Sequence, residues 1–492
     1  MNVVCGFLTK FAAKNKHIVD RMKGKFLSFT LLLATILLFA SCLDSDQDEV
    51  TYYSDTAITS FTLGTINQTV HTTKKNSDED STYTTTFDGS AYNLFIDQLN
   101  GKVYNVDSLL CGADLSKVVV TVGTKNGGIA VIKSVDNDTL KYISSSDSLD
   151  FTTERTLYVY AQNMQSRRKY VVTLCAHQEI GDTLIWHAKN SSAELAALQG
   201  MKALEGNNGL FVAGTKDNAT KVYFTEDGNS WTEKSTLASA EAYKGIITDK
   251  STLYVYTDGK VLKSNEDGSA WTEVAATTDI VRLLGAAKGN LYALGANGKI
   301  KKSADNGATW ADDDMEDNAD LTLVPNENVS MIVMPSKTNN DIYKVVLIGT
   351  STADATATEK VWTKTVDEKD PSHAAEWTYL TQEGNRYAAP RTANFTAFAY
   401  DGGIAALSGE GEGGSNAEAF KQFYFSNDEG ITWKSHSQMI LPKNFKSDCD
   451  ASCFAITSDS ANRIWIVSGT NGKVWCGRIN RLGWKEALQT NK

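Results

Sequence analysis

The sequence predicts an all-β protein, an N-terminal β-sandwich followed by a β-propeller, with six propeller blades favoured over seven. Three observations support this prediction. Short runs alternate apolar and polar residues and are rich in Val, Ile, Thr and Tyr, which is typical of strands. The chain holds 36 Gly but only 5 Pro, together with many Asn and Asp, which favours tight turns. After residue 182 one unit recurs six times, which indicates propeller blades.

Length, composition and charge limit the classes of protein to consider. The 492 residues suit two or three domains. A hydrophobic share of 41% and a charged share of 22% exclude a chain that is mainly disordered. The formal net charge is −11 and no basic stripe occurs, so we expect no nucleic-acid partner.

The N-terminal region has the pattern of an export signal. Two lysines, Lys23 and Lys25, flank the start of an apolar run over residues 26–40. This run is shorter than the ~20 residues of a membrane span and matches the ~7–15 residues of a signal-peptide core. We therefore expect residues 1–41 to be a signal peptide, with Met22 as the expected start.

The end of this segment, Phe39-Ala40-Ser41 before Cys42, resembles the lipobox of bacterial lipoproteins of the Bacteroidota type. Phe39 departs from the aliphatic residue usual in that family. The resemblance implies lipidation of Cys42, a membrane anchor, and an outer-membrane location, with the cell surface favoured over the periplasmic side. A plain signal peptide or an uncleaved anchor is the alternative. Cleavage before Cys42 would leave 42 basic and 58 acidic residues, a net charge of −16.

Residues 42–51 are acidic, which predicts a solvated tether. This segment resembles the acidic export tag of surface lipoproteins, and a simple spacer is the other interpretation. Residues 52–178 alternate with period two over about seven short strands, which predicts a two-sheet sandwich. The region resembles the immunoglobulin- or cadherin-like domains of such lipoproteins, which implies a spacer role.

Residues 182–492 contain the six repeated units. Each has an apolar strand, a strand that opens with Lys, an acidic Gly turn and a Trp, with Lys-to-Trp separations of 10, 11, 11, 17, 12 and 11 positions. The closing tryptophans are Trp231, Trp271, Trp310, Trp377, Trp433 and Trp484. The strand at residues 183–186 has no unit of its own and is a candidate to pair with the last blade and close the ring.

Two of the turns match Ser-x-Asp-x-Gly-x-Thr-Trp in full, and two are looser copies. The pattern resembles the Asp-box, the bacterial neuraminidase repeat of sialidases and sortilin-like receptors. The resemblance implies turns on the outer rim of the propeller, where Asp accepts backbone amides, Gly supplies a positive φ and Trp covers the turn. The predicted structural residues are Ser303, Asp305, Gly307 and Trp310; Ser426, Asp428, Gly430 and Trp433; Asp267, Gly268 and Trp271; and Asp227, Gly228 and Trp231.

In the looser copy before Trp271, Glu266 takes the Asp position. A catalytic role for Asp305 or Asp428 is not expected. A sialidase needs three arginines around a carboxylate, and the best remnants here are Arg386-Tyr387 and Arg391. We predict no catalytic residues on this basis.

No cofactor and no metal site are predicted, because the six histidines are scattered and the acidic loop at residues 312–317 is interpreted as solvated rather than as a Ca²⁺ site. Five cysteines follow Cys42, an odd number that does not suggest a disulfide framework. A bridge among Cys449, Cys453 and Cys476 stays open, and we expect most of the five, with Cys111 and Cys175, to be small buried residues.

These observations favour a non-enzymatic surface module that binds a glycan or a protein through the propeller face. The insertions of the fourth and fifth blades are the first place to look for that site, because function concentrates on variable loops. The alternative is a carbohydrate-active hydrolase of sialidase-like fold with an unrecognised carboxylate pair, and a purely structural subunit is the third interpretation.

Overall fold

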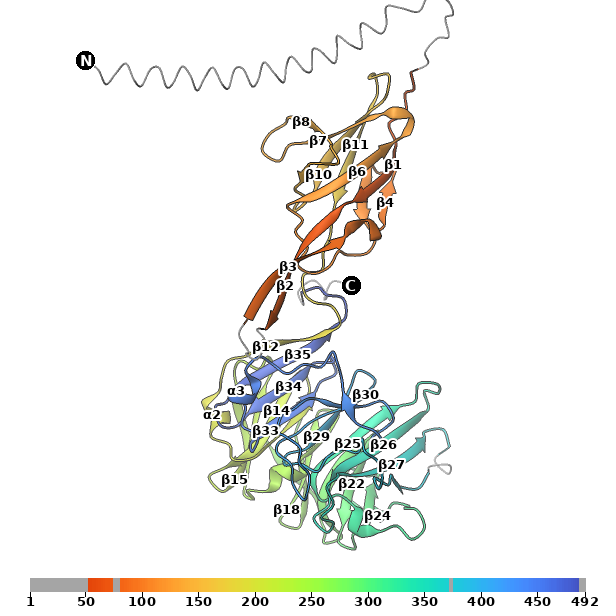
Figure 1. Ribbon diagram of the computed structural model, residues 1–492. Coiled ribbons are helices and arrows are strands. Elements are labelled where there is room, and N and C mark those ends of the chain that lie inside the picture. Colours follow the sequence, from red (N-terminus) through yellow and green to blue (C-terminus); the bar gives the residue numbers. More distant parts are fainter. Residues whose placement is uncertain (1–51, 74–79, 371–374, 486–492) are drawn as a thin grey trace, which may run out of the picture.

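A computed structural model describes residues 52–73, 80–370 and 375–485. The predicted signal peptide, Cys42 and the whole of the acidic tether lie outside the described residues. Within the described ranges, no helix has the length and apolar character needed to cross a membrane. A small sandwich precedes a larger propeller along the chain (Figure 1), so the predicted all-β fold is confirmed.

The N-terminal sandwich has a three-stranded sheet and a six-stranded sheet that share one apolar core. The first sheet has the order β1 (Ile58–Leu63), β6 (Val118–Thr124) and β9 (Ser148–Leu149). The second has the order β4 (Leu94–Asp97), β5 (Lys102–Asn105), β11 (Arg167–Thr173), β10 (Arg155–Tyr160), β7 (Ile129–Lys133) and β8 (Leu140–Tyr142). Strand β5 runs parallel to β11, and the other pairs are antiparallel.

A separate hairpin of β2 (Thr65–Thr73) and β3 (Asp80–Asp88) extends from the sandwich (Figure 1). The hairpin and the short strands β8 and β9 raise the number of strands above the roughly seven expected. Strand β8 is exposed along its whole length, and β9 has only two residues. Such strands leave little hydrophobic periodicity to detect.

The propeller consists of six four-stranded sheets, as predicted. Five follow the chain in order, and their strands are β13–β16 (Met201–Gly206, Gly209–Lys216, Ala219–Thr225, Thr232–Leu237), β17–β20 (Ile247–Asp249, Thr252–Thr257, Lys260–Ser264, Trp271–Ala276), β21–β24 (Ile280–Ala287, Asn290–Gly295, Ile300–Ser303, Ala311–Asp312), β25–β28 (Glu327–Pro335, Ile342–Thr350, Lys360–Asp367, Thr378–Tyr379) and β29–β32 (Thr396–Tyr400, Gly403–Leu407, Tyr424–Ser426, Lys434–Ser435).

The sixth sheet closes the ring with strands from both ends of the propeller sequence. Its order is β12 (Thr183–Ala188), β35 (Val474–Asn480), β34 (Ile464–Ser468) and β33 (Phe454–Ser458). Strand β12 pairs with β35 along its whole length, so the predicted pairing of this early strand with the last blade is confirmed. The innermost strands contact one another in turn around the ring, from β13 through β17, β21, β25 and β29 to β33, which contacts β13.

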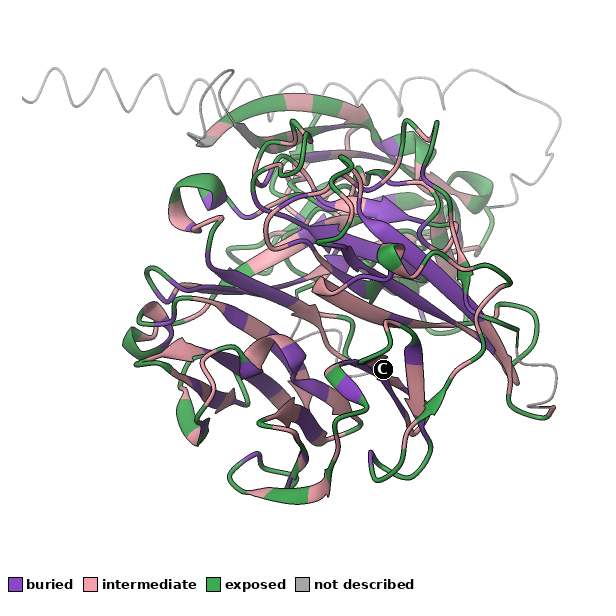
Figure 2. Cartoon of the chain, turned by 90° about the horizontal axis from the view of Figure 1, so that it is seen from below, coloured by how far each residue is buried: buried purple, intermediate pink, exposed green. Residues whose placement is uncertain are grey.

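One hydrophobic cluster fills each of the six interfaces between neighbouring blades. Five of the repeated tryptophans pack against or within the interface that their blade shares with the preceding one: Trp231, Trp271, Trp310, Trp377 and Trp433. In the sixth interface Trp186 of β12 takes this place, so the prediction that Trp484 closes a sixth unit is wrong. Figure 2 shows that buried residues concentrate in the strands, whereas connecting loops are largely exposed.

None of the five cysteines of the described chain forms a disulfide, so no bridge joins Cys449, Cys453 and Cys476. These three are buried, whereas Cys111 is half-buried and Cys175 is exposed. Burial raises the pKa of Cys449 to about 12 and that of Cys453 to about 11, so both stay protonated and unreactive near neutral pH.

Candidate ligand-binding site

The turn between β23 and β24 is organised by the carboxylate of Asp305. Its Oδ1 accepts the hydroxyl of Ser303 at 2.7 Å and the amide of Thr309 at 2.9 Å, and its Oδ2 accepts the hydroxyl of Thr309 at 2.6 Å. Gly307, with a φ of 92°, donates its amide to Ser303 Oγ, and its carbonyl accepts Trp310 Nε1 at 3.2 Å. Hydrogen bonds from Thr309 and Ser303 stabilise the ionised carboxylate and lower the pKa of Asp305 to about 2.

The turn between β31 and β32 repeats this arrangement. Asp428 accepts the hydroxyl of Ser426 at 2.8 Å, and the amide and hydroxyl of Thr432 at 2.8 and 2.7 Å. Gly430 has a φ of 94°, and its carbonyl accepts Trp433 Nε1 at 3.0 Å. Burial acts to raise the pKa of Asp428, but the hydrogen bonds from Thr432 and Ser426 outweigh it and lower this pKa.

The first looser turn, before Trp231, keeps part of this network. Thr225 takes the place of the leading Ser, and its hydroxyl accepts the amide of Gly228 at 2.8 Å. The carboxylate of Asp227 accepts the amide of Asn229 at 2.8 Å. The shorter loop therefore retains the bonds of the leading hydroxyl and of the Asp carboxylate, but Trp231 Nε1 has no hydrogen-bond partner within the described residues.

The second looser turn, before Trp271, differs from the match to the Asp-box pattern, which placed Glu266 at the Asp position. Asp267 accepts the amide of Ser269 at 3.0 Å, while the side chain of Asn265, rather than the expected Glu266, accepts the amide of Ala270. Gly268 has a φ of 71°, and Trp271 donates Nε1 to Ser235 Oγ at 2.9 Å.

A cavity with a volume of about 460 Å³ lies at the propeller axis. It is lined by the innermost strand of every blade, namely β13, β17, β21, β25, β29 and β33, and by Tyr243 and Lys244 of the 3-10 helix η4 (Ala242–Gly245). Its volume falls within the ~300–1,000 Å³ of small-molecule sites. None of the Asp-box residues lines this cavity, so the turns and the candidate ligand site are separate.

Charged side chains gather on one side of the cavity. Arg282 of β21 lies 3.1 Å from Glu327 of β25, and Lys244 lies 3.5 Å from the other oxygen of the same carboxylate. Lys244 also pairs with Glu241 at 2.6 Å. Lys202 of β13 donates to the carbonyl of Lys244 at 3.5 Å and forms no ion pair within the described residues. The cluster therefore has more positive than negative charge around Lys202.

The amine of Lys202 has an altered acidity. Its side chain is partly exposed to the cavity but lies deep in the protein. Burial, followed by the positive charge of Arg282, lowers the pKa of Lys202 from 10.5 to about 8. A lysine in this state is protonated at neutral pH but gains little stabilisation from its surroundings.

The walls formed by β29 and β33 are neutral. Strands β29 and β33 present polar side chains that are partly exposed to the cavity, among them Asn394, which precedes β29, Thr396, Thr457 and Ser458. The aromatic residues Phe395 and Phe398 are only 1% and 6% exposed, so their rings belong to the core rather than to a stacking surface. The cavity thus has one cationic side and one side rich in hydroxyl and amide groups.

Other candidates from the sequence lie outside this cavity. Arg386 stacks on Tyr387 with its guanidinium carbon 4.6 Å from the ring centroid, and Arg391 donates to the carbonyl of Asp354. Neither arginine lines the axial cavity, and no residue of the blade insertions does so within the described ranges. The inner strands, and not the insertions of the fourth and fifth blades, therefore form the walls of this cavity.

The acidic loop at residues 312–317 uses its first two carboxylates internally. Asp312 pairs with Lys301 at 2.6 Å, while Asp313 pairs with Lys364 at 2.7 Å and accepts Trp377 Nε1 at 2.7 Å. Across the described residues, no group of three or more His, Cys, Asp or Glu side chains is arranged to hold a metal ion.

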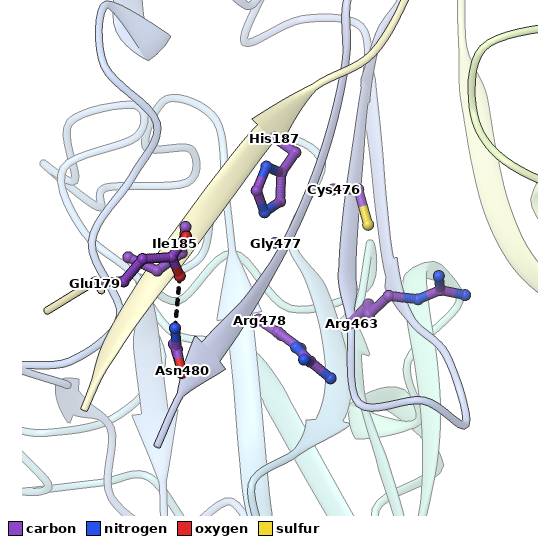
Figure 3. A pocket seen from close by; sticks show the side chains of 8 residues that line it. All are labelled: Glu179, Ile185, His187, Arg463, Cys476, Gly477, Arg478 and Asn480. Atoms are coloured by element: carbon purple, nitrogen blue, oxygen red, sulfur yellow. Dashed lines mark hydrogen bonds between the residues drawn. The ribbon is translucent and has the colours of Figure 1, made fainter. Parts of the chain in front are cut away.

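A second, much smaller hollow lies beside β12 and β35 of the closing blade (Figure 3). Its volume of about 20 Å³ has room for about one water molecule, and Asn480 within it donates to Glu179 at 2.6 Å. It is too small for an organic ligand.

The sequence did not identify Lys202, Lys244, Arg282 or Glu327 as a group. The one local sign of this group in the sequence is Lys202, a charged residue between buried neighbours in the apolar strand Met201–Gly206. Alternation predicts which face of a strand is polar, but it does not say which strands meet at an axis.

Comparison of the chain with solved structures finds propeller proteins of low similarity. Streptogramin B lyase is 13% identical to this chain with a TM-score of 0.33, and the matched region covers 60% of this chain and 98% of the lyase chain. YCF48 bound to D1 peptide is 14% identical with a TM-score of 0.31, and the match covers 60% of this chain and 96% of the YCF48 chain. The Penicillium chrysogenum alpha-L-arabinanase complexed with arabinobiose is 13% identical with a TM-score of 0.31, and the match covers 60% of this chain and 97% of the arabinanase chain. Likeness at this level carries no information on activity.

Comparison with curated proteins finds no match. Two family models match the chain in sequence. Residues 61–174 match the Domain of unknown function (DUF6242) N-terminal domain, and residues 180–487 match the DUF6242 beta propeller domain. The second match alone covers more than half of the chain, and the chain therefore belongs to the DUF6242 family.

Proposed function

We propose that the protein is a surface-exposed lipoprotein that binds a glycan or protein ligand at the axis of its propeller and does not transform it. The observation that carries this proposal is the axial cavity of about 460 Å³, to which all six blades contribute a strand. A concave site with a few polar groups among apolar walls is the usual form of a ligand site. The N-terminal sandwich serves as a spacer between anchor and propeller.

The proposed anchor rests on the sequence before and at Cys42. Replacement of Cys42 by Ala should abolish incorporation of labelled fatty acid and release the protein from the membrane fraction. Cys175→Ala is the matched control, because this thiol is exposed and free. Membrane attachment that survives Cys42→Ala would contradict lipidation at this residue.

The proposed site is tested by a glycan-array and surface pull-down screen of the protein without its predicted signal peptide. A cavity-filling variant, Thr457→Trp on the inner strand β33, should lose every ligand that the wild type captures. Thr272→Trp on the exposed outer strand β20 is the matched control and should retain them. Equal loss in both variants, or no loss in Thr457→Trp, would place binding elsewhere.

The alternative function is a hydrolase that uses two cavity carboxylates. Glu205 and Glu327 both line the cavity, which is the observation in favour of it. Glu327 is engaged with Arg282 and Lys244, and Glu205 accepts the amide of Ser460 at 2.5 Å. Turnover of any glycoside in the screen that disappears in both Glu205→Gln and Glu327→Gln would establish the hydrolase.

A further inference from the structure

The cavity wall formed by β13, η4, β21 and β25 carries an excess of positive charge. Three cations line this wall, Lys202, Lys244 and Arg282, against two carboxylates of the cavity, Glu205 and Glu327, of which Glu327 pairs with Lys244 and Arg282. Arg282 and Lys244 are both satisfied by Glu327, and Lys244 in addition by Glu241. Lys202 differs from the other two cations. Its amine donates to the backbone carbonyl of Lys244 at 3.5 Å and forms no ion pair with a carboxylate within the described residues.

This arrangement is costly for the empty protein. A buried ammonium group is stable when it is paired with an opposite charge, and a second cation nearby adds repulsion. The protein as a whole carries a net charge of −11, so the local positive charge contrasts with the rest of the surface. An anion that enters the cavity would supply the partner that Lys202 lacks.

The opposite walls limit what else the ligand contains. Asn394, Thr396 and Thr457 carry no charge, and because their donors already bond to backbone carbonyls, they offer acceptor oxygens to a ligand. A ligand that satisfies both sides has an anionic group at one end and neutral hydroxyl groups at the other. Carboxylate-bearing sugars have this composition, and an extended apolar acid does not.

We infer that the axial cavity binds the anionic group of a small polar ligand, an acidic sugar in the first place, with Lys202 and Arg282 as the residues that receive the carboxylate. This inference rests on the proposed function, since it names the class of ligand for the same cavity. Arg282 is able to offer its remaining N–H groups beside Glu327, because a guanidinium carries five donors. Lys202 acts as the principal counter-charge.

The test measures binding of matched sugars to the purified protein by saturation-transfer NMR and calorimetry at pH 6.5. The probes are D-galacturonate and D-glucuronate, with D-galactose and D-glucose as neutral counterparts and sulfate as an inorganic anion. We expect at least one uronate to bind ten-fold or more tightly than its neutral counterpart and than sulfate. Lys202→Met should weaken this binding ten-fold or more, and Lys202→Arg, which keeps the charge, should retain most of it.

Lys263→Met, at an exposed lysine of β19, is the matched control and should leave binding unchanged. Thermal unfolding of each variant shows whether it is folded. Neutral sugars that bind as well as uronates, with no effect of Lys202→Met, would overturn this inference and leave the proposed function standing. Sulfate that binds as tightly as every uronate would also overturn it, and failure of every probe together with an empty ligand screen would overturn both.

Discussion

Arg282 and Glu327 form an ion pair between the inner strands of two neighbouring blades, with Nη2 and Oε1 3.1 Å apart. Glu327 is also within 3.5 Å of Lys244, so a single carboxylate neutralises two cations at the propeller axis. The pair therefore stabilises the contact between blades and at the same time determines how much positive charge the cavity offers to a ligand.

Glu327→Gln should destabilise the fold and strengthen anion binding. The change removes the counter-charge of Arg282 and Lys244 but keeps a hydrogen-bond acceptor, so we expect the free energy of unfolding to fall by about 2 kcal/mol. Urea denaturation and uronate titration measure the two effects. Glu273→Gln, which breaks an exposed pair with Lys260, should change stability by less than about 1 kcal/mol. Weaker anion binding in Glu327→Gln would contradict this account.

Anion binding should depend on the protonation of Lys202. Because the pKa of this amine is lowered to about 8, the amine is charged below that pH, and affinity for a uronate should fall as the pH rises above it. The other charged or titratable groups near the cluster are Arg282, Lys244, Glu327, Glu241, Glu205 and Tyr243, and burial raises the pKa of Tyr243. Lys202→Arg should bind the uronate equally at pH 7 and pH 9, and a pH profile shared by both proteins would exclude Lys202 as its source.

Asp428→Ala should reduce stability without a change in ligand affinity. The substitution leaves the amide and hydroxyl of Thr432 and the hydroxyl of Ser426 without their acceptor, at a cost of about 1–3 kcal/mol. Asp305→Ala should act in the same direction. Asp136→Ala, at an exposed position of the sandwich, is the control, and loss of binding without loss of stability in Asp428→Ala would give the turn a functional role.

Glu359 should make stability depend on pH. It is buried, accepts the hydroxyl of Thr350 at 2.8 Å and the amide of Thr392 at 3.1 Å, and burial raises its pKa from 4.5 to about 7. The folded chain then holds a proton that the unfolded chain releases, so stability is greatest below pH 4.5 and falls as the pH rises to about 7.

The corresponding loss is about 3 kcal/mol, and Glu359→Gln should remove it. Chemical denaturation of wild type and variant at pH 5 and pH 8 measures the difference. Glu273→Gln should keep the wild-type dependence, and an equal fall in Glu359→Gln would show that another group is responsible.

Leu184→Ala should weaken the closure of the ring. Leu184 is 1% exposed and packs in the cluster between the fifth and sixth blades, so its truncation should cost about 2–5 kcal/mol. His187→Ala on the same strand, at an exposed position, should cost less than about 0.5 kcal/mol. Calorimetric unfolding compares them, and an equal small effect in both would mean that β12 contributes little to closure.

The repeated strands were predictable because their signal is local. Residues 209–213 and 464–467, for example, are apolar runs bounded by turns, and the spacing of Lys and Trp marks the hairpins that follow. Trp484 was misassigned because it copies the spacing of the other tryptophans, while the residue that fills the sixth interface, Trp186, lies almost 300 positions earlier and follows no such turn.

The cavity residues were not predictable for a different reason. Lys202, Arg282 and Glu327 come from three blades and share no motif, and they meet only because the ring closes. The register between blades, which decides their distances, depends on packing across the six interfaces.

A crystal structure of the protein with the tightest ligand from the screen tests the central claim most directly. We predict density for the ligand inside the axial cavity, with its anionic group within hydrogen-bond distance of Lys202 Nζ and the Arg282 guanidinium. Ligand density confined to the outer rim, beside turns such as that of Asp428 and Trp433, with an empty axis, would contradict the account.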